Sequence, residues 1–164
     1  RLVGSEMCIR DRLTIVSSSL DELEKQNLDK VNLGQHVLAE FFECDPNILN
    51  SNDKVEKYMI DAALECGATI VQKCFHMFNP YGVSGVVIIS ESHLAIHTWP
   101  ELGYAAVDLF TCGTKCDPKV AYEFLKKKFN SKKASFTELK RGIIDRETLK
   151  LAEQPFEIAE QFED

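Results

Sequence analysis

The sequence predicts an α+β fold, a two-layer sandwich in which two helices cover one face of a mainly antiparallel sheet. Two segments with apolar side chains at helical spacing, each behind a good N-terminal cap, indicate the helices. Several short segments rich in β-branched and aromatic residues, separated by brief turns, indicate the sheet. The order is strand, helix, several strands, helix, strand, and each helix must bury its apolar stripe on the sheet.

The first strand and the first helix are predicted before residue 68. Residues 34–44 are rich in Val, Leu and Phe, which is typical of a strand, and the Asp45-Pro46-Asn47 cluster ends it. Asn52 or Asp53 is expected to cap the helix, which ends at Gly67. The apolar stripe of this helix comprises Val55, Met59, Ala62, Ala63 and Cys66.

The rest of the chain is predicted to add five strands and the second helix. Asp117 and Pro118 open this helix as its N-cap and first-turn proline. Its buried stripe is expected to comprise Val120, Ala121, Phe124, Leu125 and Phe129. The strands are expected at residues 68–78, 83–90, 94–98, 104–111 and 134–139, with a turn at 79–82.

The domain boundaries follow from where this pattern begins and ends. Residues 1–12 have no period and resemble a translated sequencing adapter, so we interpret them as a non-native leader. Residues 13–32 form a leader of uncertain structure, residues 33–146 form the domain, and residues 147–164 form a polar tail. The sheet face opposite the helices also carries apolar residues, which predicts a homodimer in which a second copy covers it.

Composition excludes several classes of protein. A net charge of −7 over 164 residues argues against a nucleic-acid partner, whose phosphates require a basic face. No apolar run approaches the ~20 residues of a membrane-spanning helix. Six cysteines at irregular spacing, without a secretory signal, predict free thiols in the cytoplasm. Cys44, Cys66 and Cys74 are expected to be small buried hydrophobic residues.

Residues 83–113 hold most of the residues that suggest chemistry. An apolar strand ends at Ser90-Glu91-Ser92-His93 and another strand starts at once, without Gly or Pro between them. Such a tight junction indicates backbone strain, which tends to be kept at functional sites. A serine there can attack the carbonyl of the preceding residue, and elimination from the resulting ester then breaks the chain. Ser92, His97 and Ser84 supply the nucleophile, a base and a hydroxyl donor, with Ser90 as a rival nucleophile.

Two other kinds of site are weaker interpretations of the same residues. His93 and His97 are four residues apart, but on a strand they are separated by about 13 Å and cannot share one metal ion. Cys112 and Cys116 could supply two ligands of a metal ion, but no further ligands lie at a suitable spacing, so no metal is expected. A serine hydrolase is disfavoured because the Gly-x-Ser-x-Gly motif is missing around Ser92.

The residues around Ser92 also resemble a known family. The string ESHLAIHTWPE at residues 91–101 is similar to the processing site of S-adenosylmethionine decarboxylase of the short bacterial and archaeal type. Further similar stretches place the resemblance between about Leu33 and Arg146; they are residues 33–36, 67–71, 81–85 and 108–113. A match of this length around a self-cleavage site is far more specific than a lone glycine-rich motif.

The resemblance implies cleavage between Glu91 and Ser92, after which Ser92 becomes a pyruvoyl group. This self-generated cofactor forms a Schiff base with the substrate amine and accepts the electrons released with CO2, so no external cofactor is needed. Ser84 and His97 are implied to assist processing, His97 by proton transfer. Cys112 is implied to be the proton donor in decarboxylation.

The resemblance also implies the substrate and the residues that bind it. Phe78 and His97 correspond to positions near the adenine ring, and Glu101 corresponds to the ribose-binding carboxylate. Ala95 stands where the family often has a hydroxyl residue. The implied reaction converts S-adenosylmethionine to S-adenosyl 3-(methylthio)propylamine and CO2 and supplies aminopropyl groups for spermidine biosynthesis. The alternatives are an arginine or ornithine decarboxylase of the same family and an unprocessed regulatory homologue.

Overall fold

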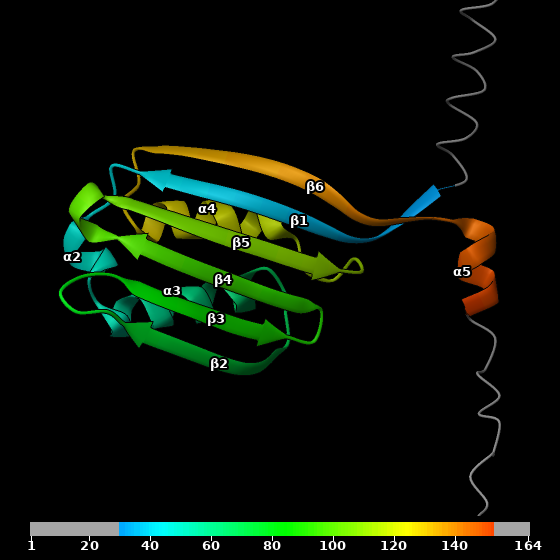
Figure 1. Cartoon of the computed structure of the whole chain (residues 1–164), viewed down its shortest axis with the longest axis horizontal. Helices are drawn as coiled ribbons and strands as arrows, with labels where there is room; N and C mark the ends of the chain where they lie inside the picture. The colour runs from blue at the N-terminus through cyan, green and yellow to red at the C-terminus, as the bar shows by residue number, and fades with distance from the viewer. Residues whose placement is uncertain (1–29, 153–164) are drawn as a thin grey trace, which may run out of the picture. The chain divides into compact units, whose positions relative to one another are not determined.

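The computed structural model describes residues 30–152 and contains one six-stranded sheet (Figure 1). The strand order is β2-β3-β4-β5-β1-β6. The strands are β1 (Lys30–Phe42), β2 (Ile70–Met77), β3 (Val83–Ile89), β4 (Ser92–Trp99), β5 (Tyr104–Cys112) and β6 (Lys133–Asp145). The helices are α2 (Pro46–Leu49), α3 (Asn52–Glu65), α4 (Pro118–Lys128) and α5 (Arg146–Ala152), with a 3-10 turn at Pro100–Leu102. Residues Leu33–Gly142 form one compact unit, and α5 belongs to a separate unit.

Strands β2 to β5 form an antiparallel meander, because consecutive strands pair with their neighbours along the chain. In the β3–β4 hairpin Ile89 pairs with Ser92, so the connection is only two residues long. Strand β1 adds to the other side of β5 in antiparallel register, with Gly34 opposite Cys112. The end of β5 is therefore held between the start of β4 and β1.

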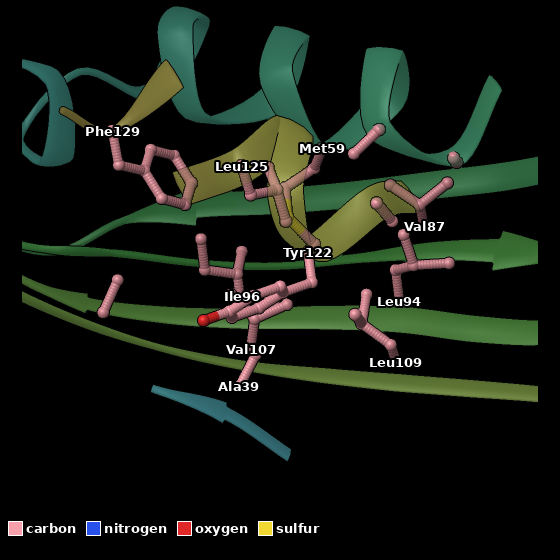
Figure 2. Close-up of a cluster of buried hydrophobic side chains, with 14 of the residues drawn as sticks. Ala39, Met59, Val87, Leu94, Ile96, Val107, Leu109, Tyr122, Leu125 and Phe129 are labelled. Carbon is pink, nitrogen blue, oxygen red and sulfur yellow. The ribbon is translucent and has the colours of Figure 1, made fainter. Parts of the chain in front are cut away.

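Helices α3 and α4 lie together on one face of the sheet (Figure 1), and the hydrophobic core fills the space between the two layers. Figure 2 shows Met59 of α3 and Leu125 of α4 above Leu94 and Ile96 of β4. These four side chains are fully buried. Alternate residues of β4, β5 and the second half of β1 are buried in this layer, which is the pattern of a sheet covered on one face.

Both long helices begin at capped N-termini. The Ser51 hydroxyl accepts a hydrogen bond from the Lys54 N–H at the start of α3. The Asp117 carboxylate accepts one from the Lys119 N–H at the start of α4, directly before Pro118. Each cap satisfies a backbone donor that has no partner inside its helix.

The predicted fold class is confirmed: the protein is α+β, with an antiparallel sheet and two main helices on one face. The predicted N-cap of the first helix was wrong. The N-cap is Ser51, one residue before the predicted Asn52 or Asp53. The Asp45-Pro46-Asn47 cluster also does more than end a strand. The Asp45 side chain accepts from the Asn47 N–H and caps the short helix α2, which the sequence pattern did not predict.

Two expected buried side chains are exposed instead. Val120 lies off the stripe of α4, which starts from Pro118 and so buries Ala121 and Tyr122. Cys74 is exposed because β2 is an edge strand and no helix covers that side chain. Cys44 and Cys66 are buried as predicted.

The C-terminal part of the domain departs further from the prediction. Strand β6 runs from Lys133 to Asp145, well beyond the expected residues 134–139, and α5 follows it. From Thr137 to Ile143 every side chain of β6 is exposed. An edge strand exposed on both faces leaves no alternation of apolar and polar residues to detect. Residues 30–32 of the predicted leader at 13–32 belong to β1, and residues 147–152 of the predicted tail at 147–164 belong to α5. The rest of that leader and tail, and the predicted leader at residues 1–12, lie outside the described residues.

The sheet face opposite the helices is open in the single chain. Phe42, Ile88 and Trp99 point to this face and are 43%, 41% and 39% exposed. Tyr104 stacks between the rings of Phe42 and Trp99, with both ring centroids 5.2 Å away. No helix among residues 30–152 is long and apolar enough to cross a membrane.

Candidate active site

The turn between β3 and β4 has an unusual backbone. Two-residue hairpin loops normally place positive φ angles on the loop residues, where Gly or Asn is favoured. Here Ser90 and Glu91 both lack a positive φ, and the next residue, Ser92, has φ 152°. A serine in this region is strained, and such strain is characteristic of functional sites. The strain expected from the sequence is thus present, and it falls on Ser92.

Three hydrogen bonds to main-chain groups hold this turn in place. The Ser90 N–H donates to the Thr69 carbonyl at 2.8 Å, and the Thr69 N–H donates to the Glu91 carboxylate at 3.1 Å. The Cys112 N–H donates to the Glu91 carbonyl oxygen at 2.9 Å. That oxygen belongs to the peptide bond that precedes Ser92. A backbone donor on this oxygen stabilises negative charge there if the carbonyl is attacked.

The Ser92 hydroxyl lies against the neighbouring histidine. Its Oγ is 3.3 Å from Nδ1 of His93, and both residues are partly buried. The His93 ring packs edge-on against Phe110, with centroids 5.8 Å apart, and 6.5 Å from the ring of His36. A serine hydroxyl, an imidazole and a backbone N–H that donates to the Glu91 carbonyl therefore meet at one end of the hairpin.

A row of side chains continues from His93 across the sheet to β6. Arg141 donates to Nδ1 of His36 at 3.0 Å and lies 5.4 Å from the centre of the Phe110 ring. Burial lowers the pKa of His36; Asp108 opposes this effect, while Arg141 and His93 add to it. Since Nδ1 accepts from a guanidinium, His36 is the neutral imidazole in this arrangement.

A second group of predicted site residues gathers at the other end of the hairpin. Ser84 and His97 are opposite each other on β3 and β4, and Ser84 Oγ is 2.7 Å from Nδ1 of His97. Phe78 follows the end of β2, is 49% exposed and packs edge-on against His76, with centroids 4.7 Å apart. His76 itself pairs with Ser84 across the sheet.

Glu101 lies near this second group, in the 3-10 turn after β4. It is exposed and lines a shallow cavity of about 340 Å³. The other lining residues are Pro46, Asn47, Asn50, Tyr81 and Pro100. Asn50 also accepts from the Gly82 N–H at 3.1 Å, which ties α2 to the turn before β3. A carboxylate at the rim of a cavity of this size is suited to hydroxyl groups of a small ligand.

The predicted site residues thus form two groups within one chain. Glu91, Ser92 and Cys112 lie together at the turn, whereas Phe78, Ser84, His97 and Glu101 lie toward the opposite ends of the same strands. Ser92 and His97 are five residues apart on β4, a separation of about 16 Å. His97 therefore does not reach the Ser92 hydroxyl of its own chain. No group of three or more His, Cys, Asp or Glu residues within residues 30–152 is arranged to hold a metal ion.

Two residues at the turn were missed by the sequence interpretation. His93 was considered only as a metal ligand, although it directly follows Ser92, the candidate nucleophile. Thr69 acts through its backbone N–H and carbonyl, so its side chain gave no signal.

Comparison with known proteins identifies the family. The family model for S-adenosylmethionine decarboxylase matches residues 35–142, which include both groups of site residues. The chain belongs to the S-adenosylmethionine decarboxylase family. It is 58% identical over 113 residues to the S-adenosylmethionine decarboxylase proenzyme of Clostridium kluyveri, covering 69% of this chain and 90% of that protein. It is 56% identical over 120 residues to the proenzyme of Acetivibrio thermocellus, covering 73% and 96%.

A solved structure of this family has the same fold. The adenosylmethionine decarboxylase of Aquifex aeolicus aligns with a TM-score of 0.66 at 30% sequence identity, covering 70% of this chain and 95% of that chain. The family resemblance seen in the sequence is confirmed, and the protein is an enzyme of the S-adenosylmethionine decarboxylase family.

Proposed function

We propose that this S-adenosylmethionine decarboxylase cleaves itself between Glu91 and Ser92 and then decarboxylates S-adenosylmethionine through the resulting pyruvoyl group. The observation that carries the proposal is the geometry of the scissile bond. Ser92 is strained at φ 152°, and the carbonyl oxygen of Glu91 accepts a hydrogen bond of 2.9 Å from the Cys112 N–H. The products are S-adenosyl 3-(methylthio)propylamine and CO2, which makes aminopropyl groups available for spermidine biosynthesis.

Self-cleavage proceeds through an ester. The Ser92 hydroxyl attacks the Glu91 carbonyl, and the N–H of Cys112 holds the oxyanion. Loss of the Cα proton of Ser92 then expels Glu91 as a carboxylate and leaves dehydroalanine. Addition of water and loss of ammonia convert that residue to the pyruvoyl group. Relief of the positive φ at Ser92 favours a reaction that breaks this peptide bond.

We place the later proton transfer of processing on His97, assisted by Ser84. The two side chains are hydrogen-bonded at 2.7 Å, but they lie about 16 Å along β4 from Ser92 of the same chain. A homodimer resolves this separation, because one copy can supply Ser92 and Cys112 while the other supplies Ser84 and His97. The exposed apolar side chains Phe42, Ile88 and Trp99 on the open sheet face support such pairing.

The residues present are suited to hold S-adenosylmethionine at a pyruvoyl group on Ser92. When formed, this group supplies a conjugated carbonyl that takes up the electrons released with CO2. Cys112 is exposed at the end of β5 and delivers a proton to the substrate carbon. The aromatic faces of Phe78 and His97 suit adenine and the sulfonium charge, and the carboxylate of Glu101 suits the ribose hydroxyls.

Two rival functions are less well supported. Arginine or ornithine has no nucleoside, so Phe78 and Glu101 would have no equivalent use. A regulator that is never processed has no need of a strained Ser92 or of a donor on the Glu91 carbonyl. The proposal places the reaction in the cytoplasm, which is supported by the five described cysteines being free thiols.

The first test is the intact mass of the purified protein together with the Ser92→Ala variant. We expect the wild-type chain to give two fragments, with the C-terminal one blocked by a pyruvoyl group that borohydride reduces. Ser92→Ala is expected to stay a single chain, because the nucleophile is absent. A wild-type protein with the full translated mass and no reactive carbonyl would contradict the proposal. Release of CO2 from arginine or ornithine, but not from S-adenosylmethionine, would reassign the substrate.

A further inference from the structure

We propose that His93 is the general base of the first processing step, in which the Ser92 hydroxyl becomes the nucleophile. The inference rests on the proposed function, and it assigns a catalytic residue to the formation of the ester. It also divides the proton transfers of processing between two histidines. His93 acts in ester formation, and His97 acts in the elimination that follows.

The contact between the two side chains carries the inference. Nδ1 of His93 is 3.3 Å from Oγ of Ser92, just beyond ordinary hydrogen-bond length, as is common for catalytic pairs before the reacting geometry tightens. A base has to lie beside the proton that it removes. His93 meets this condition within its own chain, whereas His97 is about 16 Å away along β4 and can reach Ser92 only from a second copy.

The surroundings of His93 fix its ring. The backbone of His93 pairs with Ile88 of β3 and Phe110 of β5, so it is held on both sides within the sheet. Its ring rests edge-on against Phe110 at 5.8 Å. Beyond it, His36 accepts a hydrogen bond from Arg141, which places a guanidinium further along the same row.

The step is an isomerisation that needs no other reactant. Nδ1 of His93 takes the hydroxyl proton as Oγ bonds to the carbonyl carbon of Glu91. The carbonyl electrons move to the oxygen that the Cys112 N–H holds at 2.9 Å. The bond from that carbon to the Ser92 nitrogen then breaks, and His93 returns the proton to this nitrogen. The result is an ester between Glu91 and the Ser92 oxygen, a free amine on Ser92 and an unchanged His93.

The test follows cleavage over time after cell-free synthesis of the full chain. We expect His93→Ala to slow cleavage about 100-fold or more, the usual range for a lost general base. Added imidazole should restore part of the rate, because it can enter the space left by the ring. His93→Gln keeps a polar side chain of similar reach but cannot accept the proton at neutral pH, so it should be as slow as His93→Ala.

Hydroxylamine separates the two histidines, because it cleaves esters rapidly and amides hardly at all. The uncleaved His93→Ala and His93→Gln chains should resist it, since no ester forms. The His97→Ala chain should be cut at Glu91, since its ester forms and then waits for elimination. If His93→Ala does not fold, His93→Gln gives the decisive result.

Three results would overturn the role of His93. They are a wild-type cleavage rate in His93→Gln, an uncleaved His93→Gln chain that hydroxylamine cuts, and a slow His93→Ala chain that imidazole does not accelerate. None of these three results would contradict the proposal that the chain cleaves itself. A wild-type chain that is never cleaved would instead contradict the proposed function.

Discussion

At the scale of single residues, Cys112 contributes through two separate groups. Its backbone N–H donates to the Glu91 carbonyl, and this contact is fixed by the pairing of β4 with β5. Its thiol lies exposed at the end of β5, where the proposed decarboxylation needs a proton donor. In the proposed mechanism the backbone group serves processing and the side chain serves turnover, so a substitution of the side chain should separate the two reactions.

We therefore expect Cys112→Ala to cleave at close to the wild-type rate and to lose decarboxylation by about 100-fold or more, the usual effect of removing a general acid. Alanine keeps the N–H that holds the Glu91 oxygen and lacks the proton donor. Gel analysis of cleavage and release of CO2 from carboxyl-labelled S-adenosylmethionine measure the two reactions. Cys74→Ala is the matched control, because Cys74 is an exposed cysteine on β2 outside the site. Full turnover by Cys112→Ala would show that the Cys112 thiol is not the proton donor in decarboxylation.

At the scale of elements, the β3–β4 hairpin sets the geometry of the Glu91–Ser92 peptide, the proposed cleavage site, through contacts with other strands. The turn is attached to Thr69 just before β2 and to Cys112 at the end of β5. Thr69 follows Gly67, whose φ of +87° and close approach to the Lys115 carbonyl leave no room for a Cβ. Segments distant in sequence thus hold the turn in which the backbone of Ser92 is strained.

The Glu91 side chain is expected to set the rate of cleavage by anchoring the turn. Glu91→Ala removes the acceptor for the Thr69 N–H, and the loss of one such hydrogen bond should slow cleavage about tenfold. Glu91→Gln retains an oxygen at the same position and should restore most of the rate. Time courses of fragment formation after cell-free synthesis measure the difference. Equal rates in Glu91→Ala and the wild type would show that the contact with Thr69 does not position the bond.

The element scale also shows what the sequence could predict. The stripes of α3 and α4 and the strands at the centre of the sheet follow from periodicity, because one covered face imposes a regular pattern. The full length of edge strand β6 and the exposure of Cys74 on edge strand β2 were not predicted, since a strand that lacks cover carries no such pattern. At the site, the strain at Ser92 was predicted from a junction without turn residues.

The strand spacing that separates His93 from His97 also separates Ser92 from His97, but the sequence interpretation did not apply it to that second pair. The motif places Ser92 and His97 close in sequence, and only the extended strand β4 separates them by about 16 Å. The contact between Thr69 and Glu91 joins residues 22 positions apart. Thr69 takes part through its backbone N–H, which every residue except proline has, so the sequence does not reveal this contact.

At the scale of the whole molecule, the two helices cover only one face of the sheet. The predicted site residues also lie in two separate groups within one chain. The open face carries Phe42, Ile88 and Trp99, exposed to about the same extent. A C2 dimer brings the same patch of two copies together, and it can place the turn of one copy near the opposite strand ends of the other. In such a dimer, the contact that buries these apolar side chains also brings the two groups of site residues together.

This arrangement predicts that two inactive variants restore each other. Cys112→Ala lacks the proton donor of one group, and Glu101→Ala lacks the proposed ribose contact of the other. If each site takes one group from each copy, a mixed dimer contains one site with both defects and one site with neither. Coexpression with two affinity tags, purification through both and measurement of CO2 release should give about half the wild-type turnover per mixed dimer. Each variant purified alone should stay near its own low level. A mixed dimer no more active than its parents would show that each chain builds its site alone.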